Sequence, residues 1–406
     1  MRFDTVEMIN KIKYDPRSVK REKKDDTTDL YLARVSYRYA YFCRIFAVIL
    51  VILTVAFLLS GTLSYKNLYY LVKDVSLSSE YVRSVHDTVT YNVGSSQSFA
   101  LYREGIAVAS RERFSIFAVG GRELFSSNQS YANPALYTSD KYVLLCDVGG
   151  RDFSVYNSFS RAREETLSHT IYGACASKEG DFAIITGEEK YTSCVKVYKS
   201  NGKEFSYNFS SGKVVAASLS DDGRKLAVVL AFADGDGFSC EIRAYGVGSD
   251  DYESAALSFS GLVYGIKHLE NGSIAAVGAR GVNVFTSNLD LLGEYLPENE
   301  IYAYAFGDDN IAVSHIADRG AKNAVVCLDS RAKVRRSIAS ASAAISLEIC
   351  DGYVFVQRID GFERTSILTG KTERIEMPAG SFKMICADKD TLVIFAQSYS
   401  KFLSFK

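Results

Sequence analysis

Histidines and aspartates are the residues of this sequence that could support catalysis or hold a metal, and their spacing argues against both. His169, His268 and His315 fall in three separate segments, and none has an adjacent Asp and Ser that would suggest a nucleophile with its base. Asp234 and Asp236, two residues apart in a glycine-rich loop, could bind calcium through oxygen, but no further ligand follows in register. We therefore expect no catalytic residue and no metal site.

Other catalytic signatures are missing as well. The sequence contains no G-x-S-x-G, no H-E-x-x-H and no phosphate-binding loop. Quinoprotein enzymes stack their cofactor on Trp, and this chain has no Trp. The 47 Lys and Arg residues are balanced by 48 Asp and Glu residues, which excludes a polybasic nucleic-acid binder. We expect neither a cofactor nor a nucleic-acid partner.

Tyrosines and charged loops suit binding better than catalysis. An exposed Tyr supplies a large contact area at low entropic cost. Aromatic residues recur near the start of successive apolar segments, at Tyr102, Tyr137, Tyr172, Tyr264, Tyr302, Tyr304 and Phe382. Two interpretations remain open: these rings pack around a central channel, or they line a mouth that binds a peptide, a glycan or an envelope protein. The candidate partner-binding residues are Tyr102, Tyr137, Tyr172, Tyr264 and Tyr304, with Arg319 and Arg358 from charged loops.

A short apolar element recurs eight times and must position these residues. Its copies begin 36 to 48 residues apart, at Ile106, Tyr142, Phe182, Leu226, Ile274, Ile311, Tyr353 and Leu392. A period of about 40–45 residues is typical of propeller blades or of helical solenoids. The β-branched residues and the Gly, Asp, Ser and Asn turns between the copies favour strands.

Each repeat is expected to form four strands. The recurring element is apolar at successive residues, as is typical of a strand buried on both faces. In a propeller, the neighbouring blades cover both faces of such a strand. The sequence therefore predicts an all-β fold, an eight-bladed β-propeller over residues 87–406, with seven blades as the alternative if one repeat is atypical.

The two ends of the repeat region are predicted to meet. The last repeat stops after its third strand, at Lys406, whereas residues 87–93 alternate like a strand and precede the first complete repeat. We predict that residues 87–93 supply the missing fourth strand of the last blade. This pairing would close the ring and remove an open sheet edge, which invites aggregation.

Residues 45–65 form an uncharged apolar run. As a helix, this run would be roughly 31 Å long, close to the hydrocarbon thickness of a bilayer. Because 44 residues precede it and no small-residue cleavage pattern follows, an uncleaved transmembrane helix is expected rather than a signal peptide. The expected divisions are a cytoplasmic tail (1–44), the transmembrane helix (45–65), a juxtamembrane linker (66–86) and the propeller (87–406).

The flanking charges predict the orientation of this helix. Residues 1–44 contain eleven Lys and Arg residues, whereas only Lys66 and Lys73 lie between the span and Arg83. Positive charge stays inside, so the N-terminus is predicted to be cytoplasmic and the C-terminal domain extracytoplasmic, in a single-pass protein of the cell membrane. Seven of the eight cysteines would then lie outside; their odd number and the absence of C-x-x-C argue against a disulfide framework.

Two turns of the repeats resemble those of known propellers. Residues 217–229 (ASLSDDGRKLAVV) and 174–185 (ACASKEGDFAII) resemble the S-x-D-G-x-x-L-A turn of the translocation-associated, lactonase-like and quinoprotein-like bacterial propellers. The whole chain resembles an uncharacterised clostridial family of single-pass membrane proteins with an extracytoplasmic propeller. That resemblance implies the architecture and the anchor, and it carries no known activity.

The function expected from the sequence is a non-catalytic binding or scaffold module of the bacterial cell envelope. The absence of a convergent catalytic set favours this function. Two alternatives stay open: a propeller-type hydrolase or lactonase, which rests on fold analogy alone, and a sensor whose tail relays ligand binding inward.

Overall fold

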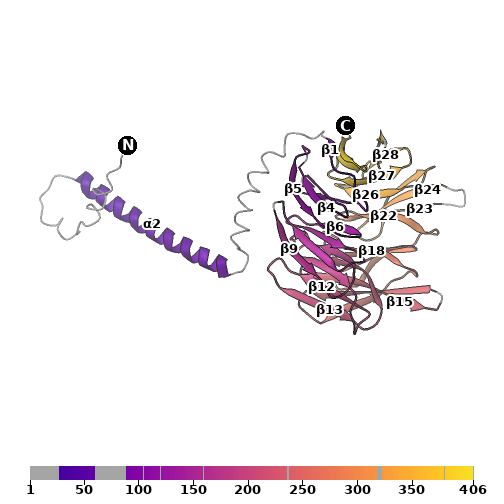
Figure 1. The fold of residues 1–406 in the computed structure, drawn as a ribbon, viewed down its shortest axis with the longest axis horizontal. Coiled ribbons are helices and arrows are strands. Elements are labelled where there is room, and N and C mark those ends of the chain that lie inside the picture. Colours follow the sequence, from indigo (N-terminus) through magenta and orange to yellow (C-terminus); the bar gives the residue numbers. More distant parts are fainter. Residues whose placement is uncertain are drawn as a thin grey trace. The chain divides into compact units, whose positions relative to one another are not determined.

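The computed structural model describes residues 27–59 and 88–405, except 104, 119, 159, 236, 318–321 and 379. The chain divides into two compact units, Met1–Leu68 and Tyr69–Lys406. Within the described residues, the second unit consists of eight four-stranded antiparallel sheets arranged as the blades of a propeller (Figure 1). The predicted eight-bladed β-propeller is thereby confirmed, and the seven-bladed alternative is wrong.

The strands follow one another from the centre of each blade to its rim, and blade 1 begins at β2. The innermost strands are β2 (Ser98–Tyr102), β6 (Pro134–Thr138), β10 (Ile171–Ala176), β14 (Lys213–Leu219), β18 (Val263–His268), β22 (Ile301–Phe306), β26 (Ser346–Cys350) and β30 (Lys383–Cys386). The second strands are β3 (Gly105–Ala109), β7 (Val143–Asp147), β11 (Phe182–Thr186), β15 (Lys225–Asp234), β19 (Ile274–Gly278), β23 (Asn310–Ile316), β27 (Tyr353–Arg358) and β31 (Thr391–Phe395).

The outer half of each blade consists of a largely buried third strand and a partly exposed rim strand. The third strands are β4 (Arg113–Phe117), β8 (Asp152–Tyr156), β12 (Ser193–Tyr198), β16 (Gly237–Gly246), β20 (Gly281–Phe285), β24 (Asn323–Asp329), β28 (Gly361–Ser366) and β32 (Tyr399–Ser404). The rim strands are β5 (Glu123–Asn128), β9 (Arg161–Thr166), β13 (Glu204–Phe209), β17 (Tyr252–Ala256), β21 (Leu291–Tyr295), β25 (Val334–Ser340), β29 (Thr372–Glu376) and β1 (Thr88–Thr90). Rim strands such as β9 alternate between exposed and half-buried residues, because their outer edge meets solvent.

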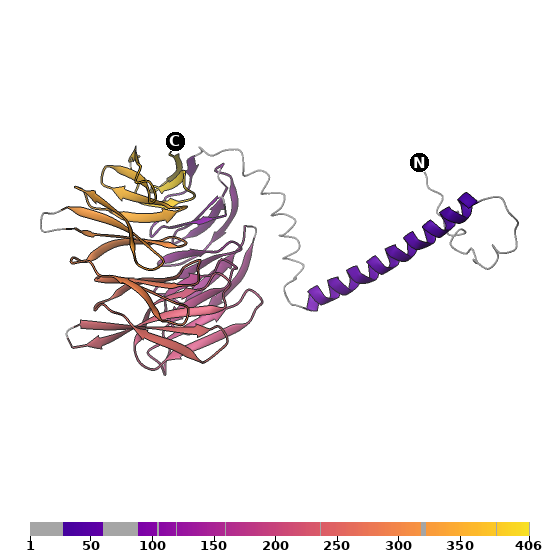
Figure 2. The same cartoon turned by 180° about the vertical axis from the view of Figure 1, so that it is seen from behind.

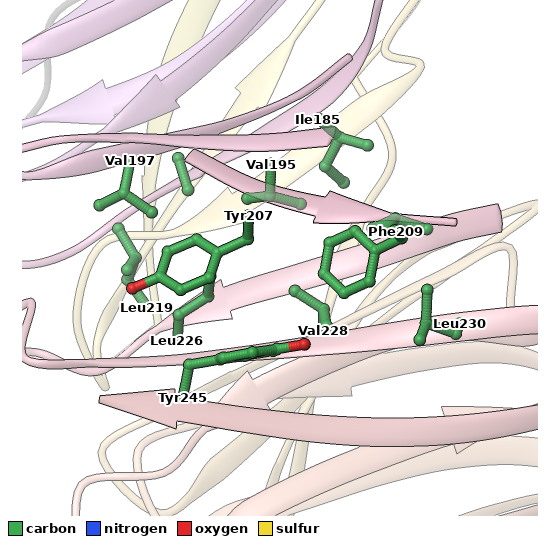
Figure 3. Packing of buried hydrophobic residues seen from close by; sticks show 12 residues of the cluster. Ile185, Val195, Val197, Tyr207, Phe209, Leu219, Leu226, Val228, Leu230 and Tyr245 are labelled. Atoms are coloured by element: carbon green, nitrogen blue, oxygen red, sulfur yellow. The ribbon is translucent and has the colours of Figure 1, made fainter. Parts of the chain in front are cut away.

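The core lies between the blades. The second strands β3, β7, β11, β19 and β31 are buried at every residue, as the recurring apolar element predicted. Each pair of neighbouring blades encloses one apolar cluster. In the cluster between blades 3 and 4, Tyr207 and Phe209 of one blade face Leu226, Val228 and Tyr245 of the next (Figure 3). A blade is thus stabilised only when both of its neighbours are in place.

The ring closes through β1, as predicted for residues 87–93. Strand β1 pairs antiparallel with β32, with Val89 opposite Ser400. The two strands lie side by side near the C-terminus in both views (Figures 1 and 2). Val89 is fully buried in the cluster between blades 8 and 1, and the Tyr91 hydroxyl donates to the carbonyl oxygens of Ala396 and Tyr399, at 2.7 Å each. The first and last described strands of the propeller therefore share one blade.

The first unit contains the helix α2 (Thr27–Leu59). It begins well before the predicted transmembrane segment and overlaps that segment from Ile45 onward. Apolar side chains on all sides of this part are exposed, including Phe46, Leu50 and Ile52. Among the described residues, no helix combines the length and the apolarity that a bilayer crossing requires. Residues 60–65 of the predicted span and the predicted linker 66–86 lie outside the described residues.

Candidate binding surface

The inner strands surround the central channel, and all of them begin on the same face of the propeller. Neighbouring inner strands, such as β10 and β14 or β22 and β26, are in contact around the axis. Because the strands of a blade are antiparallel, the turns between second and third strands lie on the face where the inner strands begin. The connections from one blade to the next end there too. We call this side of the disc the mouth face.

Four consecutive inner strands carry an extra residue at the same place. The register shifts between Ile171 and Gly173 in β10, and at the equivalent point in β14, β18 and β22. Such a β-bulge re-aims the side chain of the inserted residue. The inserted residues are Tyr172, Val215, Tyr264 and Tyr302, and their side chains are 39–44% exposed.

Blades 7 and 8 extend this arrangement without a bulge. Ile345 and Phe382 directly precede β26 and β30, and both are exposed. The mouth face therefore carries a series of exposed apolar side chains from six consecutive blades. We call this set the apolar ring, and its members are Tyr172, Val215, Tyr264, Tyr302, Ile345 and Phe382.

Two members of the apolar ring, Tyr302 and Tyr264, are held in place by neighbouring side chains. The Tyr302 hydroxyl accepts a hydrogen bond from Ser314 Oγ at 2.8 Å and donates to Asn323 Oδ1 at 3.2 Å. The Tyr264 ring stacks on that of Tyr304, with 6.1 Å between the centroids and 18° between the planes. These contacts hold the two tyrosine side chains in position before a partner binds, which lowers the entropic cost of binding.

The predicted tyrosines divide between the ring and the core. Tyr172 and Tyr264 belong to the apolar ring. Tyr304 is half-buried behind Tyr264, and its hydroxyl donates to the Tyr264 carbonyl at 2.9 Å. Tyr137 is half-buried, and burial raises the pKa of its hydroxyl. Tyr102 is 2% exposed and donates to the Lys141 carbonyl at 2.7 Å, so its prediction as a surface residue is wrong.

Arg358 is also misplaced by the sequence prediction. It closes β27 and is 1% exposed, and it lies against the connection that leads into its own blade before β26. Its Nε donates to Glu363 Oε2 and its Nη1 to the Ser342 carbonyl, both at 2.6 Å. A guanidinium held this way joins β28 to the connection before β26 and cannot reach a partner. Arg319, the other predicted arginine, lies outside the described residues.

Sequence reasoning missed Val215 and Ile345. Aliphatic residues at the start of an inner strand resemble ordinary core residues. The four bulges cannot be predicted from the alternation of apolar and polar residues in the sequence. Tyr302 and Phe382 belonged to the recurring aromatic set but not to the predicted binding residues. The sequence offered one indication of the apolar ring: its members lie at a similar distance before the recurring apolar element of each repeat.

Charged groups lie deeper, along the inner strands. Glu348 of β26 has Oε2 4.0 Å from the Cys386 thiol of β30. Burial raises the pKa of Glu348 to about 7, although Lys383 and Lys267 pull it down. Burial also lowers the pKa of Lys383, whose Nζ donates to the Phe99 carbonyl at 2.9 Å. These groups give the inner strands of blades 5, 7 and 8 a polar layer.

The three histidines of the propeller repeats make local contacts. Burial lowers the pKa of His268 to about 4, and its Nδ1 lies 3.2 Å from Ser218 Oγ. His315 Nε2 is 2.8 Å from the Tyr295 hydroxyl, and His169 Nε2 is 3.3 Å from Glu188. All eight cysteines are free thiols. Within the described part of the chain, no group of His, Cys, Asp and Glu has the arrangement of a metal site.

The eight sheets and their closing strand define a closed, eight-bladed β-propeller with an apolar ring on one face. Residues 78–394 match the family of unknown function DUF5711, and the chain belongs to that family. The comparison with curated proteins gave no match.

Several solved propellers share this fold at low sequence identity. Sqt1 of Chaetomium thermophilum, bound to the N-terminus of the ribosomal protein L10, superposes with a TM-score of 0.56 at 13% identity, covering 79% of this chain and 100% of that one. Sqt1 of Saccharomyces cerevisiae gives 0.55 at 10% identity, with 79% and 98% covered. BamB of Moraxella catarrhalis gives 0.52 at 11% identity, with 79% and 98% covered. At such identities, the likeness concerns the fold alone.

Proposed function

We propose that this protein is a membrane-anchored, extracytoplasmic propeller that binds a protein partner through its apolar ring, as a non-catalytic scaffold of the cell envelope. The ring is the observation that carries the proposal. Exposed apolar side chains gathered on one face of a soluble domain typically mark an interaction site. Here they come from six consecutive blades and occupy equivalent positions, so the exposure is systematic rather than scattered.

The chemistry of the ring favours a polypeptide partner over a glycan. Sugars stack on aromatic platforms, whereas Val215 and Ile345 offer aliphatic surface that suits apolar side chains. Charged groups border the ring: Lys213 has its Nζ 4.5 Å above the Tyr172 ring, and Glu300 precedes β22. Protein interfaces combine such an apolar, aromatic centre with a polar rim.

The membrane anchor rests on α2 and its flanking charges. An apolar helix surface needs an apolar surrounding, and Phe46, Leu50 and Ile52 are exposed in the described part of α2. The basic residues of the N-terminal tail favour the cytoplasmic side, which would place the propeller outside. An anchored propeller with its ring free is suited to hold a second envelope protein near the bilayer.

The test is crosslinking capture from membranes of the native host. The ring variants Tyr302→Ala and Val215→Asp should each reduce the captured partner by about tenfold or more, because they remove contacts at the centre of the interface. The matched control is Tyr252→Ala, since Tyr252 is equally exposed but lies on the rim strand β17. Thermal unfolding of each variant checks that the fold is kept.

Capture that is equal for the wild type and for both ring variants would contradict the binding role of the ring. Turnover of an ester or lactone panel by the purified chain, abolished by a chelator, would contradict the non-catalytic role and favour the hydrolase alternative.

A further inference from the structure

Blade 5 carries a pocket of about 490 Å³ beside the apolar ring. Three connections of the mouth face line it: residues 258–260 before β18, Arg280 in the turn between β19 and β20, and residues 296–300 before β22. Phe259 is buried beneath it, and Leu296 is half-exposed at its side. Pockets of this size commonly take a ligand group of several heavy atoms up to a small molecule.

Two glycines make room for the apolar part of this pocket. A Cβ at Gly278 would lie 2.4 Å from the Phe259 ring, and a Cβ at Gly281 would lie 2.6 Å from Leu296. Any larger residue at either end of this turn would displace Phe259 or Leu296. The glycines therefore let both apolar side chains sit directly against the turn.

Hydrogen bonds hold the three connections together. The side chain of the fully buried Asn283 accepts from the Ser258 amide at 3.1 Å and donates to Ser258 Oγ at 2.7 Å. Ala279 donates its amide to the Leu262 carbonyl and accepts from the Ile301 amide, at 3.2 and 2.7 Å. The pocket is therefore formed by connections that are fixed to one another before a ligand binds.

The charges around the pocket are unbalanced. Arg280 faces Glu300 at 3.9 Å, and both side chains are more than 60% exposed, so this pair is weak. Glu298 adds a second exposed carboxylate, which forms no ion pair with any described residue. The excess negative charge favours a ligand that brings a cation next to its apolar group.

The pocket is continuous with the apolar ring along the chain. Leu262, which is exposed, follows residues 258–260 and leads to Tyr264, while Glu300 lies two residues before Tyr302. We infer that this pocket and the neighbouring ring members hold an extended polypeptide segment in which an apolar side chain enters the pocket next to a Lys or Arg. Alternate side chains of such a segment point the same way, which suits two anchor points on one surface. This inference rests on the proposed function and names the chemistry of the partner.

The test is selection of random heptapeptides displayed on phage against the full chain in nanodiscs, followed by fluorescence anisotropy of the selected peptides. We expect enrichment of peptides with Leu, Ile or Phe beside Lys or Arg. Leu296→Asp and the double variant Glu298→Lys/Glu300→Lys should each weaken their binding about tenfold or more. The matched controls are Leu368→Asp and Glu253→Lys, which alter exposed residues away from the mouth of blade 5.

The outcomes separate the two proposals. Some selected peptides could need Tyr302 for binding and yet bind the pocket variants as tightly as they bind the wild type. That result would overturn the inference about the pocket and would leave the proposed binding role of the apolar ring intact. Enrichment of acidic peptides would also overturn it, since the charge argument would be reversed. A failure to select any peptide whose binding depends on Tyr302 would count against both proposals.

Discussion

At the scale of single residues, burial changes the chemistry of Glu348. Its carboxyl lies between the inner strands of blades 7 and 8, and burial outweighs the attraction of Lys383 and Lys267, so its pKa rises from 4.5 to about 7. A folded-state pKa above the unfolded value means that the folded chain binds the proton more tightly. Glu348 therefore lowers the stability progressively as the pH rises from about 4.5 to about 7, and the loss stays constant above that range.

Glu348→Gln should raise the thermal unfolding midpoint at pH 8 and leave it nearly unchanged at pH 4.5. Glutamine stays neutral, so the variant avoids the cost of a buried carboxylate. Circular dichroism melts between pH 4.5 and 8 measure this difference. Glu376→Gln, on the exposed edge of β29, is the control and should follow the wild type. Identical profiles for Glu348→Gln and the wild type would show that burial does not dominate at this site.

Arg358 stabilises the fold instead of contacting a partner. Arg358→Ala should lower the free energy of unfolding by about 3–5 kcal/mol, because it leaves the half-buried Glu363 without its cation. Urea denaturation monitored by tyrosine fluorescence measures this loss. Arg224→Ala is the control, since that side chain is 83% exposed, and it should change stability by no more than about 0.5 kcal/mol. Equal urea midpoints for the two variants would contradict the structural role of Arg358.

At the scale of strands, four consecutive inner strands carry a bulge near their first residues. A regular strand alternates faces, so one inserted residue moves a side chain out of the alternation. In β22, Tyr302 is the residue without a partner in β23, and it is exposed between the buried Ile301 and Ala303. In each of these four blades, the residue left without a partner is an exposed apolar one.

The closing strand β1 is short, but it seals the ring. Val89→Asp should lower the thermal midpoint sharply and promote aggregation, since a carboxylate in the cluster between blades 8 and 1 would cost roughly 3 kcal/mol or more. Thr90→Asp, on the exposed side of the same strand, should leave the midpoint close to that of the wild type. Melting followed by size-exclusion chromatography distinguishes the two. A Val89→Asp protein that stays monomeric with an unchanged midpoint would show that the ring closes without β1.

At the scale of the whole molecule, the prediction concerns topology. A reporter enzyme fused after Lys406 should be active outside the cytoplasm, and added protease should remove it from intact spheroplasts. The excess of Lys and Arg before α2 is the reason, because basic flanks stay on the cytoplasmic side. The control fuses the same reporter to the N-terminus, where it should be protected. A protected C-terminal reporter would contradict the orientation.

The sequence by itself determined the architecture of the propeller. The apolar elements that begin near Ile106, Leu226 and Leu392 recur at blade spacing, and every copy became a buried second strand. The missing fourth strand of the last repeat also indicated ring closure, since a sheet edge needs a partner. Repeat length, turn residues and apolar runs are local features, so a single chain displays them without tertiary information.

Only the tertiary structure decided which side chains reach the surface. Tyr102 and Tyr302 both belong to inner strands, yet Tyr102 ends β2 and is buried against the next blade, whereas Tyr302 lies near the start of β22 and is exposed. Arg358 follows a strand like any loop arginine, but the connection at Ser342 covers it. Exposure depends on register and on the neighbouring blade, which lie far from the residue in the chain. The pocket of blade 5 arises for the same reason, because its three walls meet only after the ring has formed.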